Sequence, residues 1–171
     1  MTKEGVRSRS ESNLKEGDLV TFLQVARDKG SFEAEATRRT LPDGRIQIGP
    51  FSTTDSPLAY LDTWRSYRGG FAGKEEVMCD GKAVWHRSYK AELLNEKYRE
   101  GELHSQLSGV LRAALNNSPT SYRRGPDRIE VGDYVYESDF MGNISSFVGS
   151  ERIFHGNEKI FILFYNGEVT D

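Results

Sequence analysis

Phe71-Ala72-Gly73-Lys74-Glu75 is a short segment that returns, with changes, as Phe147-Val148-Gly149-Ser150-Glu151 in the second half of the chain. The same offset aligns Tyr89 with Tyr165, and no gap is needed between the two places. Internal repeats are sought first because a repeated unit decides the fold. The pattern therefore predicts two copies of one structural unit.

A helix is expected before the strands of each half. In the first half, apolar residues follow the spacing of an amphipathic helix at Leu19, Phe22, Leu23 and Ala26. In the second half, an equivalent stripe is formed by Leu103, Leu107, Val110, Leu111 and Ala114. The runs that follow each helix alternate around turns such as Asp80-Gly81, which is typical of antiparallel hairpins.

These elements predict an α+β fold that arose by internal duplication. Each half would hold one helix and a three- to four-stranded antiparallel meander, and a pseudo-twofold axis would relate the halves. Units of this size are too small to be stable alone, so we expect one domain. It would span residues 18–171, with repeats at about 18–95 and 102–171, after a flexible tail at residues 1–17.

Composition excludes several classes of protein. The chain has 171 residues and a formal net charge of −3, which disfavours a broad nucleic-acid-binding surface. Its densest apolar run, Ile160 to Tyr165, has the length of a strand and not of a membrane span. The first residues of the sequence lack the continuous apolar stretch of a secretory signal, so we expect a cytoplasmic protein that does not bind membranes. Cys79 is the single cysteine and the histidines are scattered, so neither a metal site nor a cofactor is predicted.

Two aligned strands differ in polarity. In the second half, residues 160–165 are apolar at every position, so this strand is expected to be covered on both faces. In the first half, His86 and Arg87 stand where Ile162 and Leu163 stand in the second. The earlier strand is therefore expected to face water, a cleft or a binding partner.

Glu75 and Glu151 are the sharpest candidates for chemistry. Period-two alternation places them on the same strand faces as Val77 and Ile153, at the rim of a predicted core. Such carboxylates could act as an acid–base pair or bind a cationic ligand. Alternatively, each could accept hydrogen bonds from the preceding turn and have only a structural role, which the repetition of the motif favours.

Aromatic and arginine side chains supply the remaining candidates. Aromatic residues on strands usually form core, but together with a few polar groups they can line a ligand pocket. The arginine pairs Arg38-Arg39 and Arg123-Arg124 could bind an anion or could protect strand edges. The predicted recognition surface consists of Trp64, Glu75, Trp85, Arg87, Tyr89, Glu151 and Tyr165. No nucleophile or phosphate-loop motif is present, so no catalytic residue is assigned.

Six short motifs carry a family resemblance. In the first half they are Leu58-x-Tyr60-x-Asp62, Gly70-Phe71-x-Gly73-x-Glu75-x-Val77 and Gly81-Lys82-x-Val84-Trp85. In the second half they are Tyr122-Arg123-x-Gly125-Pro126, Gly132-Asp133-Tyr134-x-Tyr136 and Phe147-x-Gly149-x-Glu151. As a set they resemble domain-of-unknown-function family 5680, from about Leu19 to Glu168. The resemblance implies a bacterial, archaeal or viral cytoplasmic protein, with members that follow helix-turn-helix regulators, and it brings no catalytic residue.

The sequence thus favours a non-enzymatic binding module over an enzyme. Its ligand would be a small molecule that the protein senses or sequesters, with anionic and nucleotide-like compounds among the candidates. One alternative is a hydrolase or isomerase with Glu75 or Glu151 as general base. Another is a pure protein–protein interaction domain, which could form a homodimer through an exposed strand of the first half. The chain has no room for a helix-turn-helix of its own, so direct DNA reading is not expected.

Overall fold

The computed structural model describes residues 15–33 and 37–170. Its helices are α1 (Glu16–Glu33), the short 3-10 helix η2 (Glu96–Tyr98) and α2 (Gly101–Asn116). The strands of the first half are β1 (Arg39–Thr40), β2 (Ile46–Ser52), β3 (Leu58–Tyr67), β4 (Gly70–Cys79) and β5 (Lys82–Leu93). The strands of the second half are β6 (Arg128–Val131), β7 (Tyr134–Asn143), β8 (Ser146–His155) and β9 (Glu158–Val169). Most of the predicted tail lies outside the described residues.

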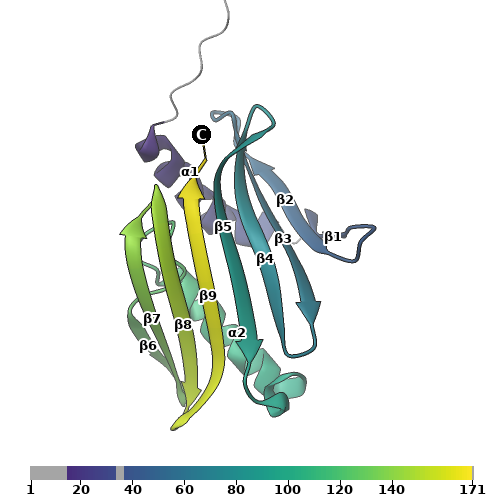
Figure 1. Cartoon of the computed structure of the whole chain (residues 1–171), viewed down its shortest axis with the longest axis vertical. Coiled ribbons are helices and arrows are strands. Elements are labelled where there is room, and N and C mark those ends of the chain that lie inside the picture. The colour runs from purple at the N-terminus through teal and green to yellow at the C-terminus, as the bar shows by residue number, and fades with distance from the viewer. Residues whose placement is uncertain (1–14, 34–36, 171) are drawn as a thin grey trace, which may run out of the picture.

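The nine strands found within residues 15–33 and 37–170 form one antiparallel sheet in the order β1-β2-β3-β4-β5-β9-β8-β7-β6. The centre of the sheet is the pairing of β5 with β9, which runs from Trp85 opposite Val169 to Leu93 opposite Phe161. Both helices lie on one face of the sheet, where α1 contacts β2 and β3 and α2 contacts β6 and β7 (Figure 1). Neither α1 nor α2 covers the other face, which we call the open face.

The predicted α+β fold of two duplicated halves is wrong. The protein is mainly β, with a single continuous sheet, and a duplicated pair of helix-plus-meander halves is not shown. The physical reason is the long pairing of β5 with β9. It satisfies backbone groups that separate meanders would have left exposed at their edges, so the strands merge into one sheet that dominates the fold.

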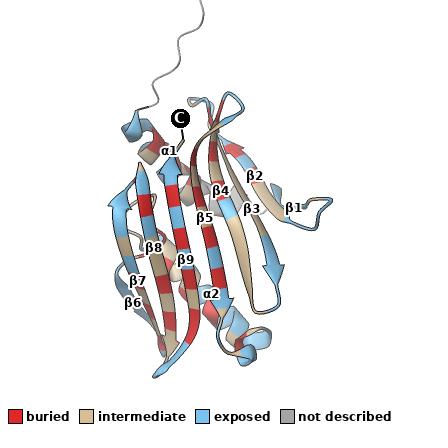
Figure 2. Ribbon diagram, in the orientation of Figure 1, coloured by how far each residue is buried: buried red, intermediate tan, exposed pale blue. Residues whose placement is uncertain are grey.

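The predicted apolar stripes of both helices are confirmed. Leu19, Phe22, Leu23 and Ala26 are all buried against the sheet. In α2, Leu107, Val110 and Ala114 are buried in the same core. Buried residues are concentrated on the inner, helix-covered side of β5, β9 and β8, where they alternate with less buried neighbours (Figure 2).

The prediction that β9 is covered on both faces is wrong. Leu163 and Tyr165 are buried under the helices, but Phe164, between them, is 58% exposed on the open face. The earlier strand meets its expectation on one face only: His86 is half-buried and Lys90 is exposed on the open face, whereas Arg87, on the helix-covered face, is 6% exposed. Apolar character on both faces of a strand thus does not prove that both faces are covered, since an exposed aromatic residue is tolerated.

Two tyrosines lie across glycines on the inner face of the sheet. Tyr89 of β5 is opposite Gly73 of β4, and Tyr165 of β9 is opposite Gly149 of β8. A Cβ atom at either glycine would overlap the phenol ring of its partner. Glycine is therefore required at both positions for the close approach of the rings.

Candidate functional site

Four charged side chains form a buried ionic cluster between the sheet and the helices. It consists of Glu75 on β4, Arg87 on β5, Glu151 on β8 and Arg124 from the loop between α2 and β6. Arg124 Nε donates to Glu151 Oε1 at 2.8 Å, and its Nη1 donates to Glu75 Oε1 at 3.3 Å. Arg87 Nη2 donates to the second oxygen of Glu75, Oε2. We call this set the ionic cluster.

The strand register explains half of the ionic cluster. Glu75 is the cross-strand partner of Arg87 in the β4–β5 hairpin, so this ion pair is local. Glu151 and Arg124 come from distant parts of the chain and join it only in the folded protein. Burial alone would lower the pKa of Arg124, but Glu151 and Glu75 raise it above its ordinary value. The guanidinium group is therefore charged and shared by two carboxylates.

Asp62 of β3 stands at the edge of the ionic cluster. Its Oδ1 accepts a hydrogen bond from the hydroxyl of Tyr89 at 2.7 Å. Burial, followed by repulsion from Glu75, raises the pKa of Asp62 from 3.8 to about 7. Burial also raises the pKa of Glu151, against the opposing effect of Arg124. The carboxyl group of Asp62 thus changes its protonation state near neutral pH.

Arg87 of the ionic cluster and Arg27 of α1 hold the loop that follows α2. Arg87 Nη1 donates to the backbone carbonyl of Tyr122 at 2.9 Å. Arg27 of α1 donates to the carbonyls of Thr120 and Arg123, at 3.2 Å in the second case. Because guanidinium groups are rigid multiple donors, these bonds fix the loop backbone between α1 and the sheet.

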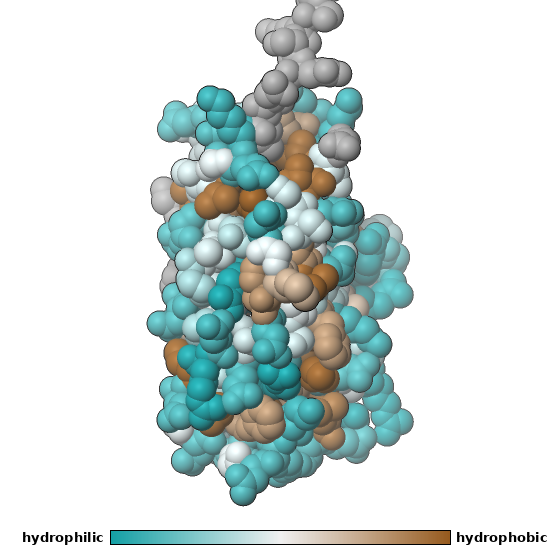
Figure 3. Space-filling model, turned by 60° about the vertical axis from the view of Figure 1, so that its left-hand side comes forward, coloured by the Kyte–Doolittle hydropathy of each residue, from teal (hydrophilic) through white to brown (hydrophobic). Residues whose placement is uncertain are grey.

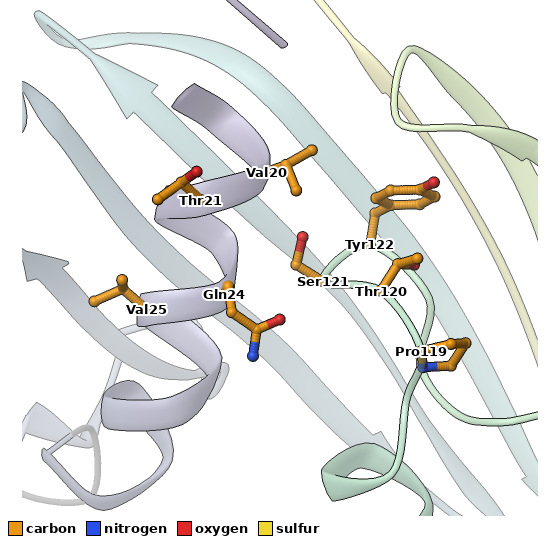
Figure 4. Close-up of a pocket in the computed structure, with 8 residues that line it drawn as sticks. All are labelled: Val20, Thr21, Gln24, Val25, Pro119, Thr120, Ser121 and Tyr122. Carbon is orange, nitrogen blue, oxygen red and sulfur yellow. The ribbon is translucent and has the colours of Figure 1, made fainter. Parts of the chain in front are cut away.

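A groove runs between α1 and this loop (Figure 4). Its volume is about 550 Å³. It is lined by Val20, Thr21, Gln24, Val25, Pro119, Thr120, Ser121 and Tyr122. Ser121 is 5% exposed, and its buried hydroxyl oxygen has no hydrogen-bond partner among the described residues. In Figure 4 the Ser121 hydroxyl is directed toward the space between α1 and Tyr122.

The structure brings some of the predicted site residues together. Glu75, Arg87 and Glu151 meet in the ionic cluster, and the Tyr89 ring lies under the Arg124 guanidinium, 5.2 Å from its centroid. None of the seven predicted residues lines the groove.

The three other predicted residues have packing contacts. Trp85 is fully buried and stacks on Phe147, and Tyr165 lies on Gly149. Trp64 lies apart from them, half-buried beneath the guanidinium of Arg38.

Sequence reasoning missed the residues that form the groove. Ser121 and Tyr122 lie in a loop without periodicity, so no pattern marked them as a site. One available signal was the motif that begins at Tyr122, which stood out in the family resemblance but was not connected with α1. The arginine pairs were noticed, yet their members have different environments: Arg124 is buried, whereas Arg39 bonds Gln47 on the surface.

Within the part of the chain that the structure describes, no cluster of three or more potential ligands could hold a metal ion. Among the same residues, neither helix has the length and apolar character of a membrane span.

Comparison with known proteins gives one family. No curated protein and no solved structure matches the chain. The family model described as a domain of unknown function, DUF5680, matches residues 62–169. This range extends from Asp62 at the edge of the ionic cluster through the groove loop to the end of β9, and it covers more than half of the chain. The protein therefore belongs to the DUF5680 family.

Proposed function

We propose that the protein is a non-enzymatic binding module and that the groove between α1 and residues 119–122 receives a small ligand. The observation that carries the proposal is the buried hydroxyl of Ser121, which lines the groove and has no partner among the described residues. The volume of about 550 Å³ supports it, because small-molecule sites typically span roughly 300–1,000 Å³.

Binding is favoured over general-base catalysis. A general base must come within hydrogen-bond distance of the proton that it removes. Both oxygens of Glu75 are bound by guanidinium groups, and Glu151 is 1% exposed and paired with Arg124. Neither carboxylate lines the groove. The ionic cluster instead supports the groove, because it holds the Tyr122 backbone in place.

Binding can be tested with N-phenyl-1-naphthylamine, an uncharged apolar dye that fluoresces on leaving water. We expect saturable binding to the wild-type protein and at least a fivefold weaker affinity for Thr21→Phe, because Thr21 is exposed in the groove and a phenyl ring would fill it. The measurement is a fluorescence titration with excitation above the absorption of tryptophan.

Ser108→Phe is the matched control. Ser108 is exposed on α2, and its hydroxyl bonds the carbonyl four residues earlier, as that of Thr21 does on α1. We expect this variant to bind the dye like the wild type. Absence of saturable binding, or equal loss in both variants, would contradict the proposal.

A second candidate function is association through the open face of the sheet, and one observation favours it. Met141, Val148 and Phe164 are 71%, 51% and 58% exposed on this face. Met141 is the cross-strand partner of Val148, and Phe164 is on the neighbouring strand. Contiguous exposed apolar side chains mark interaction surfaces. The surface in Figure 3 is largely hydrophilic but is interrupted by hydrophobic areas.

The charges on the open face suit a second copy of the chain. Lys90 pairs with Glu92 at 3.0 Å, and Arg152 pairs with Asp139 at 2.6 Å. Because opposite charges are paired within the face, two copies could approach each other without strong repulsion.

A further inference from the structure

We infer that the ligand of the groove is an uncharged molecule with an apolar body and one hydrogen-bonding group that meets the Ser121 hydroxyl. This inference rests on the proposed function and adds the chemical class of the ligand. It departs from the anionic ligand that the arginines suggested in the sequence.

The wall of the groove is largely apolar and uncharged. Val20, Val25, Pro119 and Tyr122 supply apolar surface from both sides. The other lining residues are uncharged polar ones, and none of the described lining residues carries a charge. A charged ligand would lose hydration here without gaining an ion partner, which is costly. An uncharged ligand avoids this cost.

The arginines near the groove already have hydrogen-bond partners within the protein. Arg87 and Arg124 donate to the carboxylates of the ionic cluster, and Arg87 also donates to the Tyr122 carbonyl. Arg27 donates to the carbonyls of Thr120 and Arg123. These bonds direct the guanidinium groups toward the loop backbone and the carboxylates. Withdrawing one for an anion would leave a buried partner unpaired, which is strongly unfavourable.

Ser121 differs from other polar groups of the groove in its hydrogen bonding. The Thr21 hydroxyl donates to the Gly17 carbonyl at 2.9 Å, and the Gln24 amide donates to Asp28 at 2.9 Å. The Thr120 carbonyl accepts from Arg27 and from the Ser118 hydroxyl. Among the side chains that line the groove, Ser121 alone has a buried polar atom without a hydrogen-bond partner in the described part of the chain. Since a buried unpaired polar group is unfavourable, a ligand that bonds it gains affinity and selectivity.

The test uses three naphthalene probes that differ in one substituent. Naphthalene, 2-naphthol and 2-naphthoate are each titrated into the protein loaded with N-phenyl-1-naphthylamine, and displacement of the dye is measured. We expect 2-naphthol to bind roughly three- to tenfold more tightly than naphthalene, as one neutral hydrogen bond predicts, and 2-naphthoate to bind most weakly. In Ser121→Ala the preference for 2-naphthol should fall below twofold.

Ser105→Ala is the control, because this exposed serine also loses only a hydroxyl, one bonded to the Gly101 carbonyl of its own helix. It should keep the full preference for 2-naphthol. Tightest binding of 2-naphthoate, failure of all three probes to displace bound dye, or an unchanged preference in Ser121→Ala would overturn the inference while leaving the groove as a binding site. Absence of dye binding to the wild type would instead contradict the proposed function. The order of the probes on the wild type decides the inference even if a variant does not fold.

Discussion

Asp62 shows how the environment of one carboxyl group can make stability depend on pH. It accepts a bond from Tyr89, yet burial and the proximity of Glu75 raise its pKa to about 7. In the unfolded chain its pKa is close to the ordinary value of 3.8. Between these values the folded protein keeps a proton that the unfolded chain loses. The free energy of unfolding therefore decreases as pH rises from about 4 to 7.

Asp62→Asn should remove this dependence, because asparagine cannot ionise and its carbonyl can still accept from Tyr89. We expect the variant to differ least from the wild type at low pH and to be more stable at pH 8.5, by up to about 4 kcal/mol, because the shift is about three pKa units and each corresponds to about 1.4 kcal/mol. Urea denaturation at a series of pH values measures the difference. A difference that does not change with pH would argue against a raised pKa.

At the scale of elements, the loop between α2 and β6 connects the two helices with the sheet. Arg124 enters from this loop and binds Glu75 and Glu151, which belong to different halves of the sheet. Arg27 reaches the same loop from α1. The position of the loop that lines the groove thus depends on the ionic cluster and on Arg27.

Arg124→Met should be strongly destabilising, because methionine keeps most of the side-chain volume but leaves two buried carboxylates without this partner. We expect the free energy of unfolding at pH 8 to fall by about 3–5 kcal/mol, the usual cost of breaking a buried ion pair. The loss should be smaller at pH 5, since Glu151 has a raised pKa and can take up a proton.

Arg128→Met provides the comparison. Arg128 also contacts two carboxylates, Glu130 and Glu137, but its side chain is 52% exposed, against 9% for Arg124. The expected loss is below about 1 kcal/mol, as for other surface ion pairs. Equal losses in the two variants by urea denaturation would mean that burial of the ionic cluster does not determine its contribution.

At the scale of the whole molecule, the sheet has one face covered by helices and one open face. The covered face carries the core and the ionic cluster, and the open face carries Met141, Val148 and Phe164. The molecule therefore offers two separate surfaces for binding, and each can be altered without the other.

Phe164→Ser should weaken self-association without loss of stability, because Phe164 is more than half exposed. We expect sedimentation velocity to show concentration-dependent dimer formation by the wild type and a monomer for the variant. Leu94→Ser is the matched control, since Leu94 is 48% exposed but follows β5 outside the sheet face. A monomeric wild type at every concentration, or dimer loss in both variants, would contradict association through this face.

Part of the site could be predicted from the sequence. Glu75 and Arg87 belong to one hairpin, so the turn position was sufficient to place them on neighbouring strands. Regular alternation from the Asp80-Gly81 turn would have set Glu75 opposite His86, and only the register shift between Val77 and Met78 brings it opposite Arg87. Arg124 could not be assigned to them, because its side chain acts across 49 residues from a loop without periodicity. Ser121 was missed for the same reason. A hydroxyl group can be identified as unpaired only when the three-dimensional positions of the neighbouring donors and acceptors are known.

By itself, the sequence determined the local elements of this protein: the apolar stripes of α1 and α2, the hairpins of alternating strands and the family to which the chain belongs. The helix stripes and the hairpins follow from interactions between residues that are near in sequence, and the family follows from the motifs themselves. Only the tertiary structure decided that β5 pairs with β9 in one sheet, that one face of this sheet stays open, and that a loop brings Arg124 and Ser121 between helix and sheet. Such contacts depend on which distant surfaces pack together, and the repeated pattern was compatible with more than one arrangement.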